Sequence, residues 1–245
     1  MQGAITLLCL PCAGASATMY LRWRRLLPGW IQVVPVELPG RGTRMGEPFE
    51  NDFGALVERL CKEQARALRG SYAIFGHSMG SLLAWGMARH LRAQGCALPT
   101  ALLASGSPAP SHRDPERFAS RNDDEALMAD LRKQGGTPEE VFASAELMSI
   151  TLSVLGADYR VCESFSYPGA DPLSMPLHVF AGREDEIEKE RIEAWAVEAG
   201  GSFSLDWFDG GHFFIRQSEQ AVLKALARRL AESVAGGANA ARAFA

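Results

Sequence analysis

Residues 72–80 read Tyr-Ala-Ile-Phe-Gly-His-Ser-Met-Gly, and they decide how the rest of the chain is interpreted. The apolar run 72–75 predicts a buried strand, and the apolar residues that follow Gly80 predict a helix. Gly76 and Gly80 stand two residues on either side of Ser78, which is the Gly-x-Ser-x-Gly spacing of a sharp strand-to-helix turn. Such a turn exposes the serine hydroxyl beside a helix N-terminus, where developing negative charge is stabilised. We therefore predict that Ser78 is a nucleophile.

Short apolar runs elsewhere in the chain predict further strands of the same sheet. These runs are residues 5–10, 31–37, 101–105, 177–181 and 203–208. Amphipathic patterns between the runs predict helices, which begin near Asn51 or Asp52, at Ser81 and at Ser218. Strands that alternate with helices of about 10–15 residues are typical of βαβ units. The sequence therefore predicts an α/β fold, with a mostly parallel sheet that helices cover on both faces.

The alternation of strands and helices stops in the middle of the chain, where the patterns are helical only. One helix is predicted to begin at Asn122 or Asp123. A second begins at residues 137–140, which read as a capping box with Pro138 at the first helical position. A third extends from about Ala145 to residue 165.

These patterns divide the chain into a core and an insertion. We predict an α/β core of residues 1–110 and 173–235, and a helical insertion of residues 111–172. Because open α/β sheets bind ligands at the carboxyl ends of their strands, an insertion there is interpreted as a lid. The alternative is a long crossover connection. The small, unpatterned residues 236–245 predict a disordered tail.

The composition of the 245-residue chain excludes several classes of protein. Hydrophobic residues make up 47% and charged residues 22%, which is enough apolar material for a sizeable core. The 25 basic and 29 acidic residues give a net charge of −4, which argues against binding to nucleic acid or to an anionic membrane surface. No apolar run approaches the roughly 20 residues that span a bilayer.

The five cysteines are an odd number without a metal-ligand spacing. Cys9 and Cys12 form one isolated Cys-x-x-Cys pair at the end of the first predicted strand. We interpret all five as free thiols in a reducing compartment, and we predict a cytoplasmic protein without a metal or a cofactor.

A serine nucleophile needs a general base, and His212 is the candidate. It lies in Gly210-Gly-His-Phe-Phe, directly after the last predicted strand, where the order Ser…Asp…His of an α/β-hydrolase puts the base. The acid that orients this histidine is predicted in Gly182-Arg-Glu-Asp-Glu, after the fifth strand. The spacing after the strand favours Asp185, with Glu184 as the alternative.

Two backbone N–H groups are predicted to hold the oxyanion. One belongs to Met79, which follows the nucleophile. The other comes from the small-residue loop after the first strand, in which Ala13 is the candidate.

Motifs spread over nearly the whole chain resemble one known family. They read Leu10-Pro-Cys-Ala-Gly-Ala-Ser, Glu37-Leu-Pro-Gly-Arg-Gly-Thr-Arg, Gly76-His-Ser-Met-Gly-Ser-Leu-Leu-Ala, Gly135-Gly-Thr-Pro-Glu-Glu-Val, Glu146-Leu-Met, Ala157-Asp-Tyr and Gly211-His-Phe-Phe-Ile. Together they resemble the type II thioesterases, which are free-standing α/β-hydrolases that accompany polyketide synthases and nonribosomal peptide synthetases. Three positions depart from the family pattern: Cys12 replaces a histidine, Ala15 replaces a glycine, and Leu155-Gly-Ala-Asp lacks an arginine.

The resemblance implies a substrate and a partner. It implies hydrolysis of acyl groups from the phosphopantetheine thiol of an acyl or peptidyl carrier protein, which clears wrongly loaded units from a synthase. A general carboxylesterase that uses the same three residues is the alternative activity. A catalytically silent binding module is the alternative of another class, and the intact Ser78, Asp185 and His212 argue against it.

An acidic carrier protein would meet a basic surface, and five arginines follow the first two predicted strands. They are Arg22, Arg24, Arg25, Arg41 and Arg44. One hypothesis is that some of them contact the carrier or the phosphate of its arm. The alternative is that all of them form a solvated basic face. Four apolar residues of the insertion either shape the acyl pocket or pack in the core, namely Met128, Leu131, Met148 and Leu152.

Overall fold

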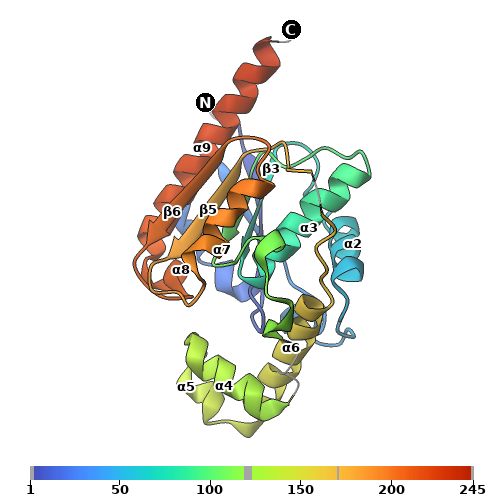
Figure 1. Cartoon of the computed structure of the whole chain (residues 1–245), viewed down its shortest axis with the longest axis vertical. Helices are drawn as coiled ribbons and strands as arrows, with labels where there is room; N and C mark the ends of the chain where they lie inside the picture. Colours follow the sequence, from blue (N-terminus) through green and yellow to red (C-terminus); the bar gives the residue numbers. More distant parts are fainter. Residues whose placement is uncertain (1–2, 119–122, 170, 244–245) are drawn as a thin grey trace.

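The computed structural model describes residues 3–118, 123–169 and 171–243, and a six-stranded sheet lies at its centre (Figure 1). The strands are β1 (Ile5–Leu10), β2 (Ile31–Pro35), β3 (Tyr72–His77), β4 (Leu102–Ser105), β5 (Leu177–Gly182) and β6 (Phe203–Phe208). Their order in the sheet is β2-β1-β3-β4-β5-β6, and all neighbouring strands are parallel. The predicted strands and the predicted parallel sheet are confirmed. Because all strands run the same way, their carboxyl ends share one edge, where the site is expected.

Alternate residues of each strand face opposite sides of the sheet and belong to two separate cores. Leu8 and Ile74 belong to one core, whereas Leu7 and Phe75 belong to the other. The first face is covered by α2 (Phe53–Glu63), α3 (Met79–Ala93), α6 (Ala145–Glu163), α7 (Lys189–Glu193) and η5 (Ala194–Glu198). The second face is covered by η1 (Ala17–Tyr20), α1 (Trp23–Leu26), α8 (Phe214–Gln217) and α9 (Glu219–Ala243).

The chain between β4 and β5 contributes a group of helices at one end of the sheet (Figure 1). It contains η3 (Pro110–His112), η4 (Pro115–Arg117), α4 (Asp124–Gln134), α5 (Glu139–Phe142) and α6. Helices α4 and α5 both pack against α6, and α6 also contacts α2. The remaining short helix, η2 (Gly42–Arg44), follows β2.

The helix starts in this segment agree with the sequence in one case and differ in another. Asp123 caps α4, because its carboxylate accepts a hydrogen bond from the N–H of Ala126; the alternative cap, Asn122, lies outside the described residues. The predicted capping box is wrong. Pro138 has an extended backbone (ψ 147°) and is itself the N-cap residue, so α5 begins at Glu139 without a side-chain cap.

The tail prediction is also wrong for residues 236–243, which continue α9. Alanine is the best helix former, and four of these eight residues are alanines. A helix that the core already holds upstream needs no new nucleation to continue through them. Among the helices of the described chain, none combines the length and apolarity needed to cross a membrane.

Candidate active site

The turn between β3 and α3 has the geometry that its sequence predicts. Ser78 has φ 54° and ψ −116°, and its N–H donates a hydrogen bond to the carbonyl of Ser105 at 2.7 Å. A Cβ atom on Gly76 would lie 1.9 Å from the carbonyl oxygen of Gly80. A Cβ atom on Gly80 would lie 2.2 Å from the carbonyl oxygen of Leu10. Strand and helix therefore meet this closely only because both positions are glycine.

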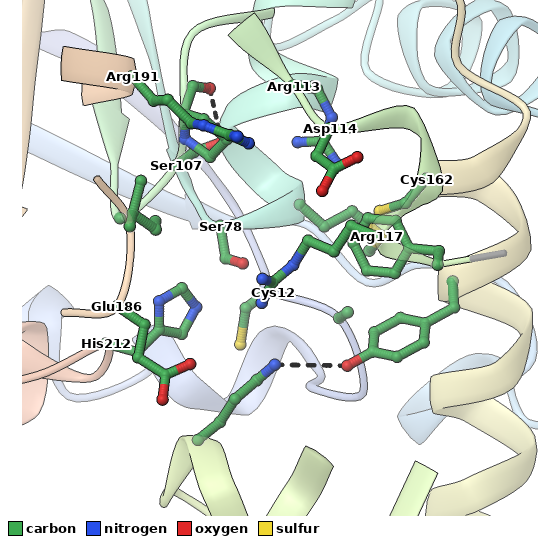
Figure 2. A pocket seen from close by; sticks show the side chains of 18 of the residues that line it. Cys12, Ser78, Ser107, Arg113, Asp114, Arg117, Cys162, Glu186, Arg191 and His212 are labelled. Carbon is green, nitrogen blue, oxygen red and sulfur yellow. Dashed lines mark hydrogen bonds between the residues drawn. The ribbon is translucent and has the colours of Figure 1, made fainter. Parts of the chain in front are cut away.

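Ser78 lies in the wall of a cavity of about 260 Å³ at the carboxyl end of the sheet (Figure 2). Figure 2 shows the Ser78 hydroxyl and the His212 imidazole on the same side of this cavity. Loops after β1, β3, β4, β5 and β6 all contribute to its wall, and so does the segment between β4 and β5. The site thus combines residues from the core and from the predicted insertion.

His212 is held by Asp185. The Nδ1 atom of His212 lies 2.9 Å from Oδ2 of Asp185, and their side chains are 14% and 3% exposed. His212 stands in the loop between β6 and α8, and Asp185 in the loop after β5. Glu184, the alternative acid, instead donates its backbone N–H to the carbonyl of Gly210. The geometry therefore selects Asp185 as the partner of His212.

All five histidines are among the described residues, and only His212 lines the cavity. His77 lies directly behind it, with ring centroids 5.2 Å apart. His77 is fully buried, and its Nδ1 is 2.9 Å from the hydroxyl of Ser105. Burial holds the pKa of His77 well below its usual value, so this ring is neutral and packs against His212.

The two predicted oxyanion residues, Ala13 and Met79, both line the cavity. Within the described chain, the N–H group of neither residue donates to a protein acceptor. Met79 is the first residue of α3, so its N–H is one of the free donors at a helix N-terminus. Both groups are therefore available to an oxygen atom in the cavity.

The loop that contains Ala13 is fixed by a buried ion pair. Arg41 and Asp158 form two hydrogen bonds of 2.6 Å, and their side chains are 6% and 1% exposed. The N–H of Gly14 donates to Asp158 at 2.8 Å, and Arg41 donates to the carbonyl of Ala15 at 3.1 Å. The pair thus joins the loop after β1, the loop after β2 and helix α6.

This arrangement corrects the prediction that Arg41 is a docking residue, because the guanidinium is buried and paired. The prediction that Arg44 is a docking residue is also corrected. Its guanidinium is 17% exposed and bonds to Glu47 and Glu63, and these bonds raise its pKa. Both arginines stabilise the loop after β2 instead of facing a partner.

The other three arginines lie on or beside α1 and are exposed. Arg22 is 71% exposed and lies 3.3 Å from Glu219. Arg24 donates from Nε to the carbonyl of Val33 at 3.2 Å. All three side chains therefore lie at the surface, where a partner protein can reach them.

The Cys-x-x-Cys pair does not form a disulfide. Cys9 and Cys12 are both free and buried, and Cys12 lines the cavity. Burial raises the pKa of Cys12 to about 12, so the thiol stays protonated.

Sequence patterns missed most of the side chains that the segment between β4 and β5 contributes to the cavity. These are Arg113, Asp114, Arg117, Phe118, Gln134, Tyr159 and Cys162. The four apolar residues proposed for the pocket do not line this cavity: Met148 and Leu152 are buried in the core, Met128 is partly buried against the core, and Leu131 borders a neighbouring hollow. The two arginines could have been noticed as charges close to the end of a strand, but no motif marks them.

Comparisons with known proteins point to one family. Residues 5–233 match the thioesterase domain family. The gramicidin S biosynthesis protein GrsT of Aneurinibacillus migulanus is 32% identical over 227 residues, which cover 92% of this chain and 89% of GrsT. The solved structure of RedJ, a thioesterase of the prodiginine pathway of Streptomyces coelicolor, has 34% identity and a TM-score of 0.85, and covers 93% of this chain and 91% of RedJ. The type II thioesterase BorB from the borrelidin biosynthetic cluster has 36% identity and a TM-score of 0.84, with 93% of each chain covered.

Proposed function

Because this chain belongs to the thioesterase domain family, we propose that it hydrolyses acyl or aminoacyl thioesters on the phosphopantetheine arms of carrier proteins. The role is editing in polyketide or nonribosomal peptide synthesis. It is supported by the likeness to the type II thioesterase BorB over 93% of both chains. One observation carries the chemistry: Ser78 and His212, which is paired with Asp185, line one cavity together with two residues whose backbone N–H groups are free, Ala13 and Met79.

The first half of the reaction makes an acyl-enzyme. Nδ1 of His212 donates to Asp185, so Nε2 is the nitrogen that accepts the Ser78 proton. The Ser78 oxygen attacks the thioester carbon, and the N–H groups of Ala13 and Met79 hold the negative oxygen that forms. The C–S bond then breaks, and the thiolate takes the proton from His212 as the free pantetheine thiol leaves.

The second half releases the acid. His212 takes a proton from water, and the resulting hydroxide attacks the acyl-Ser78 ester. The intermediate collapses with the proton returned to the Ser78 oxygen, so one water is consumed for each carboxylic acid and thiol formed. Water is the only co-reactant, and the proposal includes no metal and no cofactor. The free thiols suit a reducing compartment such as the cytoplasm.

A carrier protein is the proposed partner, and the exposed arginines beside α1 are its proposed docking surface. Reversing two of these charges, in the double variant Arg22→Glu/Arg25→Glu, is expected to raise the apparent KM for a carrier-bound substrate. The KM for the same acyl group on N-acetylcysteamine is expected to stay unchanged. An equal change in KM for both substrates would contradict docking of the carrier protein on these arginines.

The central experiment compares three forms of one acyl group. A carrier protein loaded with a short acyl-phosphopantetheine, the CoA thioester and the p-nitrophenyl ester are each incubated with the protein and with Ser78→Ala. Preferred release from the carrier, lost in Ser78→Ala, is the expected result. Equal or faster turnover of the p-nitrophenyl ester would favour the alternative, a general carboxylesterase.

A further inference from the structure

We propose that Arg113 and Arg117 form an anion subsite in the cavity beside Ser78, which takes a carboxylate or phosphate group of the substrate. The inference rests on the proposed function, because it assigns a class of substrate to the same site. Arg113 follows η3, and Arg117 is the last residue of η4. Both line the cavity that contains Ser78 and His212 (Figure 2).

The two guanidinium groups share one neighbour. Each guanidinium carbon lies 5.8 Å from the centroid of the Phe118 ring. Phe118 is buried and packs against Tyr159 of α6, with centroids 4.7 Å apart. The ring therefore places both positive charges at one part of the cavity wall.

The other charged side chains of the wall already have partners. Glu186 pairs with Lys133 at 2.9 Å, and Glu188 pairs with Arg191 at 2.7 Å. The carboxylate of Asp114 accepts the N–H of Glu116 at 2.9 Å.

Arg113 and Arg117 differ from these groups. Within the part of the chain that the structure describes, no carboxylate oxygen lies within 4.0 Å of either guanidinium. Neither guanidinium therefore has an ion-pair partner among the described residues, although the carboxylate of Asp114 lines the same cavity. Burial lowers the pKa of Arg113, the neighbouring Cys162 raises it, and the charge of Arg117 lowers it further.

An oxyanion between the two groups would give both guanidinium groups an ion-pair partner. Guanidinium groups bind carboxylate and phosphate through paired N–H donors, and arginine stays charged in proteins. A neutral acyl group would leave both cations unpaired. The partial burial of Arg113 favours the free end of an acyl group as the source, because the phosphate of the arm lies close to the carrier. We expect acyl groups that end in a carboxylate to be preferred over neutral groups of the same length.

The test compares four thioesters, in which each of two acyl groups is joined to each of two thiols. Butyryl and succinyl thioesters have the same chain length, and each is prepared on N-acetylcysteamine and on phosphopantetheine. The variant is Arg113→Gln/Arg117→Gln, and the matched control is Arg66→Gln, an exposed arginine after α2 that does not line the cavity. Melting temperatures and circular dichroism show whether each variant is folded.

The expected result is a kcat/KM for succinyl that exceeds butyryl by about tenfold or more on both thiols, since one lost charge-assisted contact has an effect of that order. The double variant loses this preference, and Arg66→Gln retains it. A preference for phosphopantetheine with both acyl groups, lost in the double variant, would assign the subsite to phosphate. Unchanged ratios in the double variant would overturn the subsite.

A binding measurement separates this inference from the proposed function. Calorimetry with Ser78→Ala measures the Kd of the four thioesters without hydrolysis, with and without the two arginine substitutions. If the wild-type protein cleaves no thioester but Ser78→Ala binds succinyl more tightly through the arginines, the proposed function fails and the subsite stands. If the protein cleaves all four and no ratio depends on the arginines, the subsite fails and the proposed function stands.

Discussion

Ser78 adopts a backbone conformation that residues with a side chain rarely adopt, and within the described chain it is the only non-glycine residue with a positive φ. Such a residue costs about 1–3 kcal/mol and persists only where its surroundings impose it. Here they do: the N–H of Ser78 bonds to Ser105, and the hydroxyl of Ser81 lies 2.8 Å from the carbonyl of Gly76. These hydrogen bonds hold the strained turn, and the turn directs the Ser78 hydroxyl toward the cavity before any substrate binds.

The glycines of this turn give the first prediction. Gly80→Ala places a Cβ atom 2.2 Å from the backbone of Leu10, which cannot move without displacing β1. We expect the free energy of unfolding in urea to fall by about 3 kcal/mol or more. Gly46→Ala is the control, since a Cβ atom there meets nothing within 4 Å. Equal stability of the two variants would contradict the close approach of strand and helix.

The thiols give a second prediction at this scale. Burial raises the pKa of Cys12 and Cys61 to about 12 and that of Cys162 to about 11, and it also raises the pKa of Cys9. All five cysteines are among the described residues, and Cys96 alone of them is exposed. Iodoacetamide at pH 8 is therefore expected to label Cys96 in the native protein and all five thiols in urea, as peptide mass spectrometry would show. Native labelling of Cys12 as fast as Cys96 would mean that the cavity wall opens.

Single residues could be predicted from sequence where their role is tied to a local spacing. Ser78, Asp185 and His212 follow strands at short, fixed distances, so the sheet alone brings them together. Arg41 was misassigned because its partner, Asp158, is 117 residues away. A loop arginine that will be buried in an ion pair has the same local pattern as one that faces solvent.

Helix α6 and the loop after β1 act as one unit, because Asp158 bonds to both Arg41 and Gly14. Gly14 directly follows Ala13, whose N–H is proposed to hold the oxyanion. The position of that N–H therefore depends on a helix of the inserted segment. This dependence makes Asp158 a positioning residue in the proposed reaction.

Asp158→Asn tests this link. The substitution leaves the buried charge of Arg41 unpaired, so we expect stability to fall by about 3–5 kcal/mol. We also expect kcat to fall about ten- to a hundredfold with little change in KM, which is less than the roughly hundred- to thousandfold loss when an oxyanion donor is removed outright. Activity is measured well below the melting temperature, so that the folded fraction is the same in all variants.

A second variant separates position from stability. Arg41→Met/Asp158→Leu replaces the pair by apolar side chains, which often restores stability. It cannot restore the bond from Gly14, so kcat is expected to stay low. Recovery of both stability and kcat would show that the ion pair has no positioning role.

The elements themselves were largely predictable, because periodicity reports which residues are buried. It does not report which partner covers them, so the placement of α4 and α5 on α6 was beyond the sequence patterns. The start of α5 was missed for a local reason: Thr137 and Pro138 suggest a capping box, but the extended Pro138 takes the N-cap position itself. The continuation of α9 was missed because small residues suggest disorder when no apolar face is present.

Across the whole molecule, one buried histidine joins three elements. His178 of β5 lies 2.7 Å from the hydroxyl of Ser204 in β6 and 2.9 Å from that of Ser233 in α9. Burial, together with the charge of Arg229, lowers its pKa from 6.5 to about 4. The folded state therefore holds this ring neutral over a range in which the unfolded chain protonates it.

Acid sensitivity is the prediction that follows. Between pH 6.5 and about 4 the unfolded state binds one more proton at this site, so stability falls as the pH falls. The total effect is about 3 kcal/mol at the low end of the range. His178→Gln is expected to reduce the slope of unfolding free energy against pH by up to about 1.4 kcal/mol per unit. An unchanged slope would mean that His178 titrates normally in the folded protein. His77 contributes in the same direction, so some slope remains in the variant.

Helix α9 runs along the sheet and ends at the opposite side of the molecule from α4 and α5 (Figure 1). The end of α9 is therefore a suitable point for attaching the protein to a solid support. If it were attached to a bead or an electrode through a linker after Ala243, the cavity would face away from the support. The cavity entrance of the immobilised enzyme would then stay accessible to a substrate as large as a carrier protein. A linker near α4 and α5 would instead turn the cavity toward the support.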